Sequence, residues 1–194
     1  MKIGVIGAGT MGSGIAQVFA AAGHTVLLCD ISEDLAAKGK DKIAKGLAKQ
    51  VAKGKMEQAA ADAVTANITT GTKEIVSDCD LVVEAALENM ELKKQCFKEL
   101  EGICKKDCIF ATNTSSLSIT ELSRGLDRAV VGMHFFNPVP AMKLVEVIAG
   151  ITTPKETVEK IIALATEIGK TPVEVKEAAG FVVNRILIPM INEA

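Results

Sequence analysis

One of the two histidines in the chain, His134, occupies a position suited to proton transfer. It lies between two apolar segments and precedes Phe135 and Phe136, whose rings would exclude water from an imidazole that exchanges protons near neutral pH. Glu146 lies in the second segment, and a chain reversal at the intervening prolines would bring carboxylate and imidazole together. Such a carboxylate fixes the tautomer of the imidazole and stabilises its charged form. Because a histidine beside two phenylalanines is more often a core residue, this interpretation depends on what else the chain binds.

A glycine-rich motif near the N-terminus predicts a ligand whose chemistry would need such a base. The short apolar segment 3–6 is typical of a buried strand and runs into a G-x-G-x-x-G motif. The motif consists of Gly7, Ala8, Gly9, Thr10, Met11 and Gly12. In a dinucleotide-binding turn the first glycine permits the tight turn, the second lets the backbone approach a pyrophosphate, and the third allows the helix to pack closely on the strand. The helix then directs its N-terminal N–H groups at the phosphates.

The residues that follow agree with this interpretation. An apolar helix over 15–22 is expected to end at Gly23, and the next strand, 25–28, leads to Asp30, about 20 residues after the glycines. Asp30 is expected to accept hydrogen bonds from ribose hydroxyls, and its charge would repel a 2′-phosphate, which favours NAD over NADP. His24 is expected at the surface, in the turn before this strand. The alternative is a structural βαβ unit that binds no ligand.

Two later strands are expected to end in polar residues at the edge of the sheet where the cofactor binds. Segment 80–86 is typical of a buried parallel strand, so Glu84 and Glu88 should lie close to the ligand. The next apolar segment runs into Asn113 and a group of hydroxyl side chains that includes Ser115. This group either contacts the ligand or caps the following helix. These elements predict an α/β fold of Rossmann type, with a doubly wound, mostly parallel sheet.

Two helical regions carry many lysines. In the shorter one, 91–100, an apolar stripe leaves Lys93 and Lys94 on the solvent side. The longer one, about 33–63, is long for a crossover connection and predicts a helical arm of two helices with a break near Gly46 or Gly54. The lysines of this region are Lys38, Lys40, Lys42, Lys45, Lys49, Lys53 and Lys55. They form either a solvated helix face or a docking surface for a polyanionic substrate such as coenzyme A.

The last segment, 181–191, is expected to begin a strongly apolar helix, which would expose an apolar face if nothing covered it. A second domain or another subunit would cover this helix. On its own, the chain is expected to self-associate.

Composition argues against several classes of partner. The formal net charge is −2 and the sequence pI is about 5.8, so neither nucleic acid nor a membrane surface is expected to bind. Aromatic residues make up 3% of the chain, with no Trp and no Tyr, which removes the usual platforms for base stacking. The five cysteines are odd in number and form no C-x-x-C motif. This pattern predicts reduced thiols in a cytoplasmic protein without a zinc site.

The whole chain closely resembles the short-chain L-3-hydroxyacyl-CoA dehydrogenases, and the bacterial 3-hydroxybutyryl-CoA dehydrogenases are the nearest subgroup. The resemblance rests on the segments GAGTMGSGIA, DLVVEAALEN, ATNTSSLSIT, GMHFFNPVPAMKLVEV and GFVVNRILIPMINEA, in this order and spacing. It implies an NAD-binding domain, here residues 1–180, followed by an all-helical domain that dimerises and closes over the substrate. Residues 181–194 would then form the first helix of a truncated C-terminal helical domain. The implied reaction interconverts (S)-3-hydroxyacyl-CoA and 3-oxoacyl-CoA with NAD, in fatty acid or butanoate metabolism.

The resemblance also implies roles for individual residues. His134 matches the family's general base and Glu146 matches the carboxylate that orients it. Ser115 and Asn184 match groups that hold the reacting oxygen, which places both of them at the substrate. Together with Asn113, the positions expected near the cofactor are Glu88, Lys93, Ser115 and Asn137. Lys53 and Lys55 fall, more loosely, in the region that meets the CoA phosphates.

The sequence departs from the family pattern at two positions and leaves other functions open. Ala179 replaces a proline that could stiffen the connection into the last helix, and Thr112 replaces a serine; neither is expected to touch the chemistry. One rival function is dehydrogenation of another 3-hydroxy acid, in which case neutralising the lysine-rich arm would not weaken substrate binding. Another is a cofactor-binding module without turnover, which would bind NAD and show no activity. A purely structural module would bind neither ligand.

Overall fold

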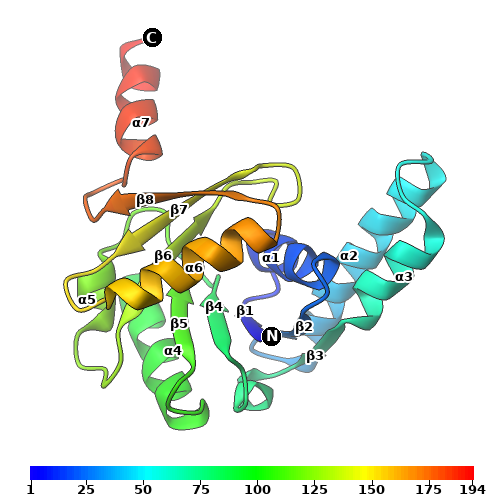
Figure 1. Cartoon of the computed structure of the whole chain (residues 1–194), viewed down its shortest axis with the longest axis horizontal. Coiled ribbons are helices and arrows are strands. Elements are labelled where there is room, and N and C mark those ends of the chain that lie inside the picture. The colour runs from blue at the N-terminus through cyan, green and yellow to red at the C-terminus, as the bar shows by residue number, and fades with distance from the viewer.

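The computed structural model describes residues 1–194 and contains a single eight-stranded sheet (Figure 1). The strands are β1 (Lys2–Ile6), β2 (Thr25–Cys29), β3 (Ile68–Gly71), β4 (Leu81–Glu84), β5 (Ile109–Thr112), β6 (Val130–Phe135), β7 (Leu144–Ala149) and β8 (Thr171–Lys176). Their order is β3-β2-β1-β4-β5-β6-β7-β8, and all neighbours are parallel except β6 and β7. The predicted doubly wound, mostly parallel sheet is confirmed, with its switch point between β1 and β4.

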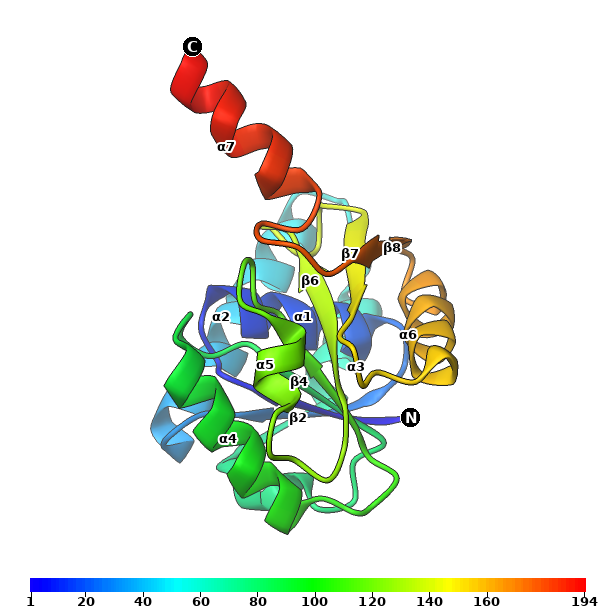
Figure 2. The same cartoon turned by 90° about the vertical axis from the view of Figure 1, so that its left-hand side faces the viewer.

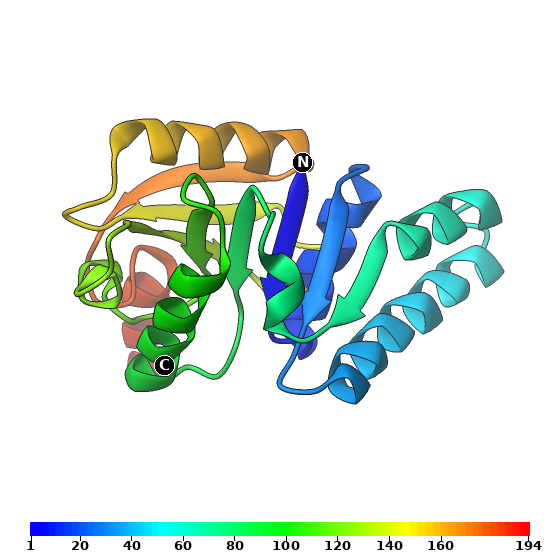
Figure 3. The same ribbon diagram turned by 90° about the horizontal axis from the view of Figure 1, so that it is seen from below.

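Helices cover both faces of the sheet, because its central strands are apolar on both sides. The helices of this body are α1 (Thr10–Ala21), η1 (Lys73–Val76), α4 (Met90–Ile103), α5 (Ile119–Ser123) and α6 (Lys155–Glu167). Side chains alternate along each strand between two cores: in β4, Val83 packs in the core under α1 and α6, and Val82 in the core under α4 and α5. Figure 3 shows α6 and α4 on opposite sides of the sheet.

The lysine-rich region forms an arm that extends from the β3 edge of the sheet (Figures 1 and 3). Helices α2 (Glu33–Ala52) and α3 (Gln58–Ala66) lie side by side in it, so the predicted helical arm is confirmed. The break falls near Gly54, whose φ of +64° suits glycine, whereas the helix continues through Gly46. The base of the arm packs tightly, because a Cβ at Gly39 would lie 2.7 Å from the side chain of Ala8.

The last helix, α7 (Val183–Glu193), projects away from the body and has no buried residue (Figure 2). It begins two residues later than expected, because Phe181 has a φ of +50° and its ring is buried beside His134 instead of continuing the helix. None of the helices combines the length and the apolar character needed to cross a bilayer.

His24 is buried, with 4% of its surface exposed, so its expected place at the surface is wrong. Its ring packs against Phe19, and its Nδ1 lies 3.3 Å from the amino group of Met1. Its Nε2 makes no hydrogen bond and lies 3.6 Å from Oε1 of Glu167. Burial and the terminal ammonium lower the pKa of His24, and Glu167 raises it by a smaller amount.

This histidine is expected to weaken the fold in acid. Because the folded pKa lies below that of the unfolded chain, the unfolded chain binds the proton first, and the free energy of unfolding should fall as the pH drops below about 6.5. Urea unfolding of the native chain and of His24→Gln between about pH 7.5 and pH 5 measures this contribution. The variant should lose less stability over that interval. An equal loss in both proteins would contradict the assignment to His24.

Candidate active site

The glycine-rich turn between β1 and α1 has the geometry of a phosphate cradle. Gly7 has a φ of +100°, and a Cβ there would lie 2.7 Å from the carbonyl oxygen of Ala85. A Cβ at Gly12 would lie 1.7 Å from the carbonyl oxygen of Gly7, so only glycine lets α1 pack this closely. The first N–H groups of α1 have no side-chain cap, which leaves them available to an anion.

Gly9 is the member of the motif that protein packing does not explain. Its φ of −69° suits any residue, and an added Cβ would meet no atom within 4 Å. A methyl group at this position would point into open space at the N-terminus of α1. A ligand that must approach the backbone explains the glycine, and the pyrophosphate of a dinucleotide fits that position.

Asp30 follows β2 and lies at the rim of this turn. Its Oδ2 accepts a hydrogen bond from the N–H of Ala8 at 2.7 Å, and its Oδ1 accepts one from the N–H of Ile31 at 2.8 Å. Each oxygen keeps a lone pair for a ribose hydroxyl. Lys42 of the arm also reaches the turn, with its Nζ 3.2 Å from Oγ1 of Thr10. The residues present therefore fit an adenosine diphosphate moiety at this end of the sheet.

His134 and Glu146 face each other across the antiparallel pair β6 and β7, whose register pairs them directly. Their Nδ1 and Oε2 atoms lie 2.7 Å apart, and the two residues are 5% and 1% exposed. The rings of Phe136 and Phe181 flank the imidazole, with ring centroids 4.5 and 5.7 Å away. Because Nδ1 is occupied by the carboxylate, Nε2 is the atom left to exchange a proton with a ligand. The structure thus brings the predicted pair together.

The second oxygen of Glu146 caps the last helix. Oε1 accepts hydrogen bonds from the N–H groups of Val182 and Val183, each at 3.0 Å, at the N-terminus of α7. One residue further, Nδ2 of Asn184 donates to the carbonyl oxygen of Ser115 at 3.2 Å. Helix α7 is therefore tied both to the histidine's partner and to the loop after β5.

The turn that lets β7 return beside β6 is held by a buried lysine. Lys170 donates from its Nζ to the carbonyl oxygens of Val139 and Met142, at 2.5 and 2.8 Å. Burial lowers the pKa of this ammonium group. Asn137, expected at the cofactor, is exposed at the start of the same turn. Lys170 could not be predicted as buried from the sequence, because a lysine between a helix and a strand carries no signal of burial.

The residues after β5 are tied to neighbouring strands. Oδ1 of Asn113 accepts from the N–H of Phe135 at 2.9 Å, which aligns the ends of β5 and β6. Ser118 caps α5 by accepting from the N–H of Glu121 at 3.1 Å, so at least one hydroxyl of this group serves as a helix cap. The contacts of Ser115 involve its backbone, which leaves its hydroxyl for a ligand.

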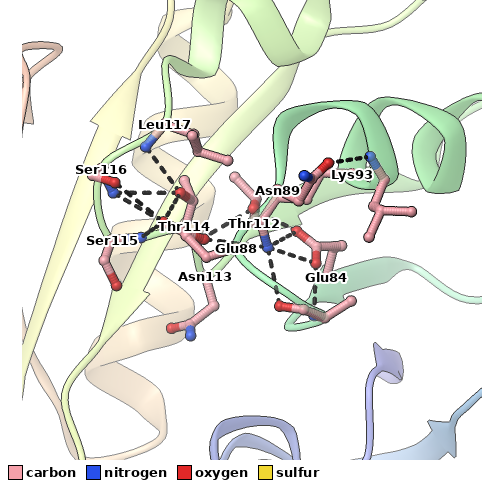
Figure 4. A network of polar contacts seen from close by, with 12 residues as sticks. Glu84, Glu88, Asn89, Lys93, Thr112, Asn113, Thr114, Ser115, Ser116 and Leu117 are labelled. Atoms are coloured by element: carbon pink, nitrogen blue, oxygen red, sulfur yellow. Dashed lines mark hydrogen bonds and ion pairs between the residues drawn. The ribbon is translucent and has the colours of Figure 1, made fainter.

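A buried ion pair lies beneath this loop (Figure 4). Lys93 is 1% exposed and its Nζ donates to both carboxylate oxygens of Glu84, at 2.8 and 2.9 Å. Its expected place on the solvent side of α4 is therefore wrong, since the buried face of that helix is formed by Lys93, Phe97 and Leu100. The spacing of these three residues is helical, and the carboxylate at the end of β4 supplies the partner that makes burial of the lysine possible. The spacing indicates which face of α4 carries Lys93, but it does not identify Glu84 as the partner.

The structure does not bring every predicted residue together. Lys53 and Lys55 lie exposed at the far end of the arm, between α2 and α3 (Figure 3). Most of the other predicted residues lie along one edge of the sheet, formed by the carboxyl ends of the parallel strands from β2 to β6. The exceptions are Lys93, which is buried in α4, Glu146 in β7 and Asn184 in α7. Along this edge lie the glycine-rich turn, which can bind an anion, Asp30, which can accept from a ribose, and His134 in β6, which can act as a base. Such a set can bind a dinucleotide and exchange a proton with a substrate beside it.

Comparisons with known proteins agree with this geometry. Residues 2–178 match the family model described as 3-hydroxyacyl-CoA dehydrogenase, NAD binding domain. The chain is 51% identical to a 3-hydroxybutyryl-CoA dehydrogenase of Clostridioides difficile, over all of this chain and 70% of that one. It is similar to the crystal structure of (S)-3-hydroxybutyryl-CoA dehydrogenase from Ralstonia eutropha, with a TM-score of 0.96 and 45% identity, over 99% of this chain and 69% of that one. It is also similar to the crystal structure of 3-hydroxybutyryl-CoA dehydrogenase from Escherichia coli, with a TM-score of 0.96 and 40% identity, over 100% of this chain and 42% of that one.

Proposed function

The chain belongs to the NAD-dependent 3-hydroxyacyl-CoA dehydrogenases, and on this premise we propose that it interconverts (S)-3-hydroxybutyryl-CoA and acetoacetyl-CoA, with His134 as the base. The observation that carries the assignment of the base is the buried contact of 2.7 Å between His134 and Glu146. When bound, NAD supplies the hydride acceptor. What remains for the protein is to move the hydroxyl proton and to hold the reacting carbon in place.

In the direction of oxidation, Nε2 of His134 takes the proton of the 3-hydroxyl group. Glu146 holds the Nδ1–H and stabilises the imidazolium that results. The rings of Phe136 and Phe181 exclude water from this exchange. In the direction of reduction, the imidazolium returns the proton to the oxygen that forms the alcohol.

The substrate oxygen would be held by the hydroxyl of Ser115 and the amide of Asn184, which already contact each other through the carbonyl group of Ser115. A donor at this oxygen stabilises the charge that develops there as the proton moves. Glu88, Asn113 and Asn137 border the same stretch of the sheet edge and would contact the nicotinamide half of the cofactor.

The CoA portion would extend toward the arm, where Lys53 and Lys55 would meet its phosphates. Both side chains are exposed and lie beyond the part of α2 that contacts the body. Lys40 and Lys42, by contrast, are engaged by the body, with Lys40 donating to the carbonyl oxygen of Ile68 at 2.5 Å. The free lysines at the far end are therefore the better candidates for a polyanionic substrate.

Oxidation of NADH by this chain with acetoacetyl-CoA tests the proposal. We expect a loss of NADH absorbance that depends on acetoacetyl-CoA and on enzyme concentration. Free acetoacetate, which has the same reacting group without the CoA phosphates, should react far more slowly. NADH binding without turnover of acetoacetyl-CoA would contradict the proposed activity of this chain.

We also propose that the chain self-associates through α7. Its apolar side chains are exposed, including Ile186 at 58% and Ile191 at 62% of their surface. Helix α7 of a second copy would cover these side chains. Sedimentation at micromolar concentration should show dimers or larger species, and the double variant Ile186→Glu/Met190→Glu should shift the chain toward monomer. A native chain that sediments as a monomer would contradict this.

A further inference from the structure

Both carboxylate oxygens of Glu84 accept hydrogen bonds from protein groups at the ligand-binding edge of the sheet (Figure 4). Glu84 is the last residue of β4 and is fully buried. Oε1 accepts from Nζ of Lys93 at 2.8 Å and from the N–H of Ala86 at 2.7 Å. Oε2 accepts from the same Nζ at 2.9 Å and from Oγ1 of Thr112 at 2.7 Å. One carboxylate thus joins the loop after β4, helix α4 and the end of β5.

The ammonium group of Lys93 extends this network toward the ligand. Besides its two bonds to Glu84, it donates to the carbonyl oxygen of Ala86 at 3.3 Å, which uses its third N–H. It also lies 3.6 Å from Oε2 of Glu88. With all three donors used within the protein, Lys93 cannot bind a cofactor directly without giving up a partner. Its effect on a ligand passes through Glu88.

Glu88 connects the network to the loop that carries Ser115. Its Oε1 accepts from Oγ1 of Thr114 at 2.6 Å and from the N–H of Ser115 at 2.7 Å. Unlike Glu84, it is partly exposed at the edge of the sheet, with 40% of its side chain accessible. The buried pair of Glu84 and Lys93 thus helps to hold Glu88, whose side chain is exposed enough to meet a ligand.

The sheet order tells which half of the cofactor this network faces. A dinucleotide crosses a doubly wound sheet at the switch point, here between β1 and β4. Asp30, the ribose acceptor of the adenosine half, follows β2 on one side of β1. On the other side of β1, Glu84 ends β4, Glu88 follows that strand, and Thr112 ends β5. The network therefore lies on the nicotinamide side.

We propose that Glu84 is a positioning residue for the nicotinamide half of NAD, acting through Lys93 and Glu88. The inference rests on the proposed place of Glu88 in the cofactor site. A buried ion pair is a weak device for stability alone, since apolar residues of similar volume often serve as well or better. What apolar residues could not do is hold the carboxylate of Glu88 by charge and orient the loop of Ala86 by hydrogen bonds.

Two ligands separate positioning from folding. NADH contains the nicotinamide, whereas ADP-ribose has the same adenosine diphosphate and second ribose without it. In Thr112→Val, which keeps the volume and removes the hydroxyl, the Kd of NADH should rise by roughly threefold or more while the Kd of ADP-ribose changes by less than about twofold. Thr112→Ser keeps the hydroxyl and serves as the matched control, with both affinities as in the native chain.

The double variant Glu84→Leu/Lys93→Met removes the pair and leaves no buried charge unpaired. Its unfolding midpoint should lie at about the same urea concentration as that of the native chain. Its Kd for NADH should rise by about tenfold or more, whereas its Kd for ADP-ribose should change little. Native NADH affinity in this variant, or an equal loss for both ligands, would overturn the positioning role. If the double variant does not fold, the comparison of Thr112→Val with Thr112→Ser decides.

Glu88→Gln tests the place of Glu88 in the cofactor site separately from the positioning role of Glu84. Unchanged NADH affinity in Glu88→Gln would remove Glu88 from the cofactor site and overturn the route through it. Weakened binding in Glu88→Gln, with native affinity for NADH in Thr112→Val and in the double variant, would overturn the role of Glu84 alone.

Discussion

His134→Gln is expected to lose roughly 10²- to 10⁴-fold in turnover of acetoacetyl-CoA while it retains its affinity for NADH. A glutamine amide can still donate a hydrogen bond to Oε2 of Glu146, so the buried carboxylate keeps a partner. What is lost is the exchangeable proton at Nε2. Steady-state kinetics with NADH and acetoacetyl-CoA, together with NADH fluorescence titration, measure the two properties separately.

The other histidine provides the control. His24→Gln makes the same substitution at a buried residue whose ring packs against Phe19 of α1, and its turnover should stay within about twofold of the native value at neutral pH. Native turnover in His134→Gln would exclude His134 as the base. A loss of NADH affinity as large as the loss of turnover would point to a role in cofactor binding instead.

Gly9→Ala should fold normally and bind NADH at least about tenfold more weakly. The backbone at this position suits alanine, and the added Cβ meets no protein atom within 4 Å, so the free energy of unfolding should hardly change. The methyl group would instead occupy the space that the pyrophosphate needs. NADH titration and urea unfolding of the same preparation test both statements.

Gly102→Ala is the matched control for this prediction. Gly102 lies in α4, where an added Cβ also meets no atom, but far from the phosphate cradle. Alanine there should stabilise the fold by about 0.5–1 kcal/mol and leave NADH affinity unchanged. If Gly9→Ala also bound NADH with native affinity, the open space above Gly9 would not be the pyrophosphate site.

The sequence predicted those parts of the fold whose signals are local. The apolar segment before Gly7, the spacing to Asp30 and the buried character of segment 80–86 together defined the sheet and its ligand-binding edge. The meeting of His134 with Glu146 followed from a chain reversal between two strands, and the register of β6 and β7 confirms it. These inferences needed only neighbours in the chain or one turn between them.

The remaining features depend on contacts between distant segments. The burial of Lys93 requires the carboxylate of Glu84 from another element, so a helix pattern considered alone placed it in solvent. His24 is buried because the chain terminus and α6 close over it. Thr112 was not expected to touch the chemistry, and the structure adds that its hydroxyl donates a hydrogen bond to Glu84. The pattern of residues along one segment does not reveal which partner from a distant segment allows a polar side chain to be buried.

The carboxylate of Glu146 contacts two parts of the protein at once, so the free energies of the two contacts are coupled. One oxygen receives the imidazole of His134 and the other receives the start of α7. If seating the start of α7 favours the contact between carboxylate and imidazole by some free energy, then that contact favours the seated helix by the same amount. A partner that binds α7 would therefore change how firmly His134 is oriented without touching a reacting atom.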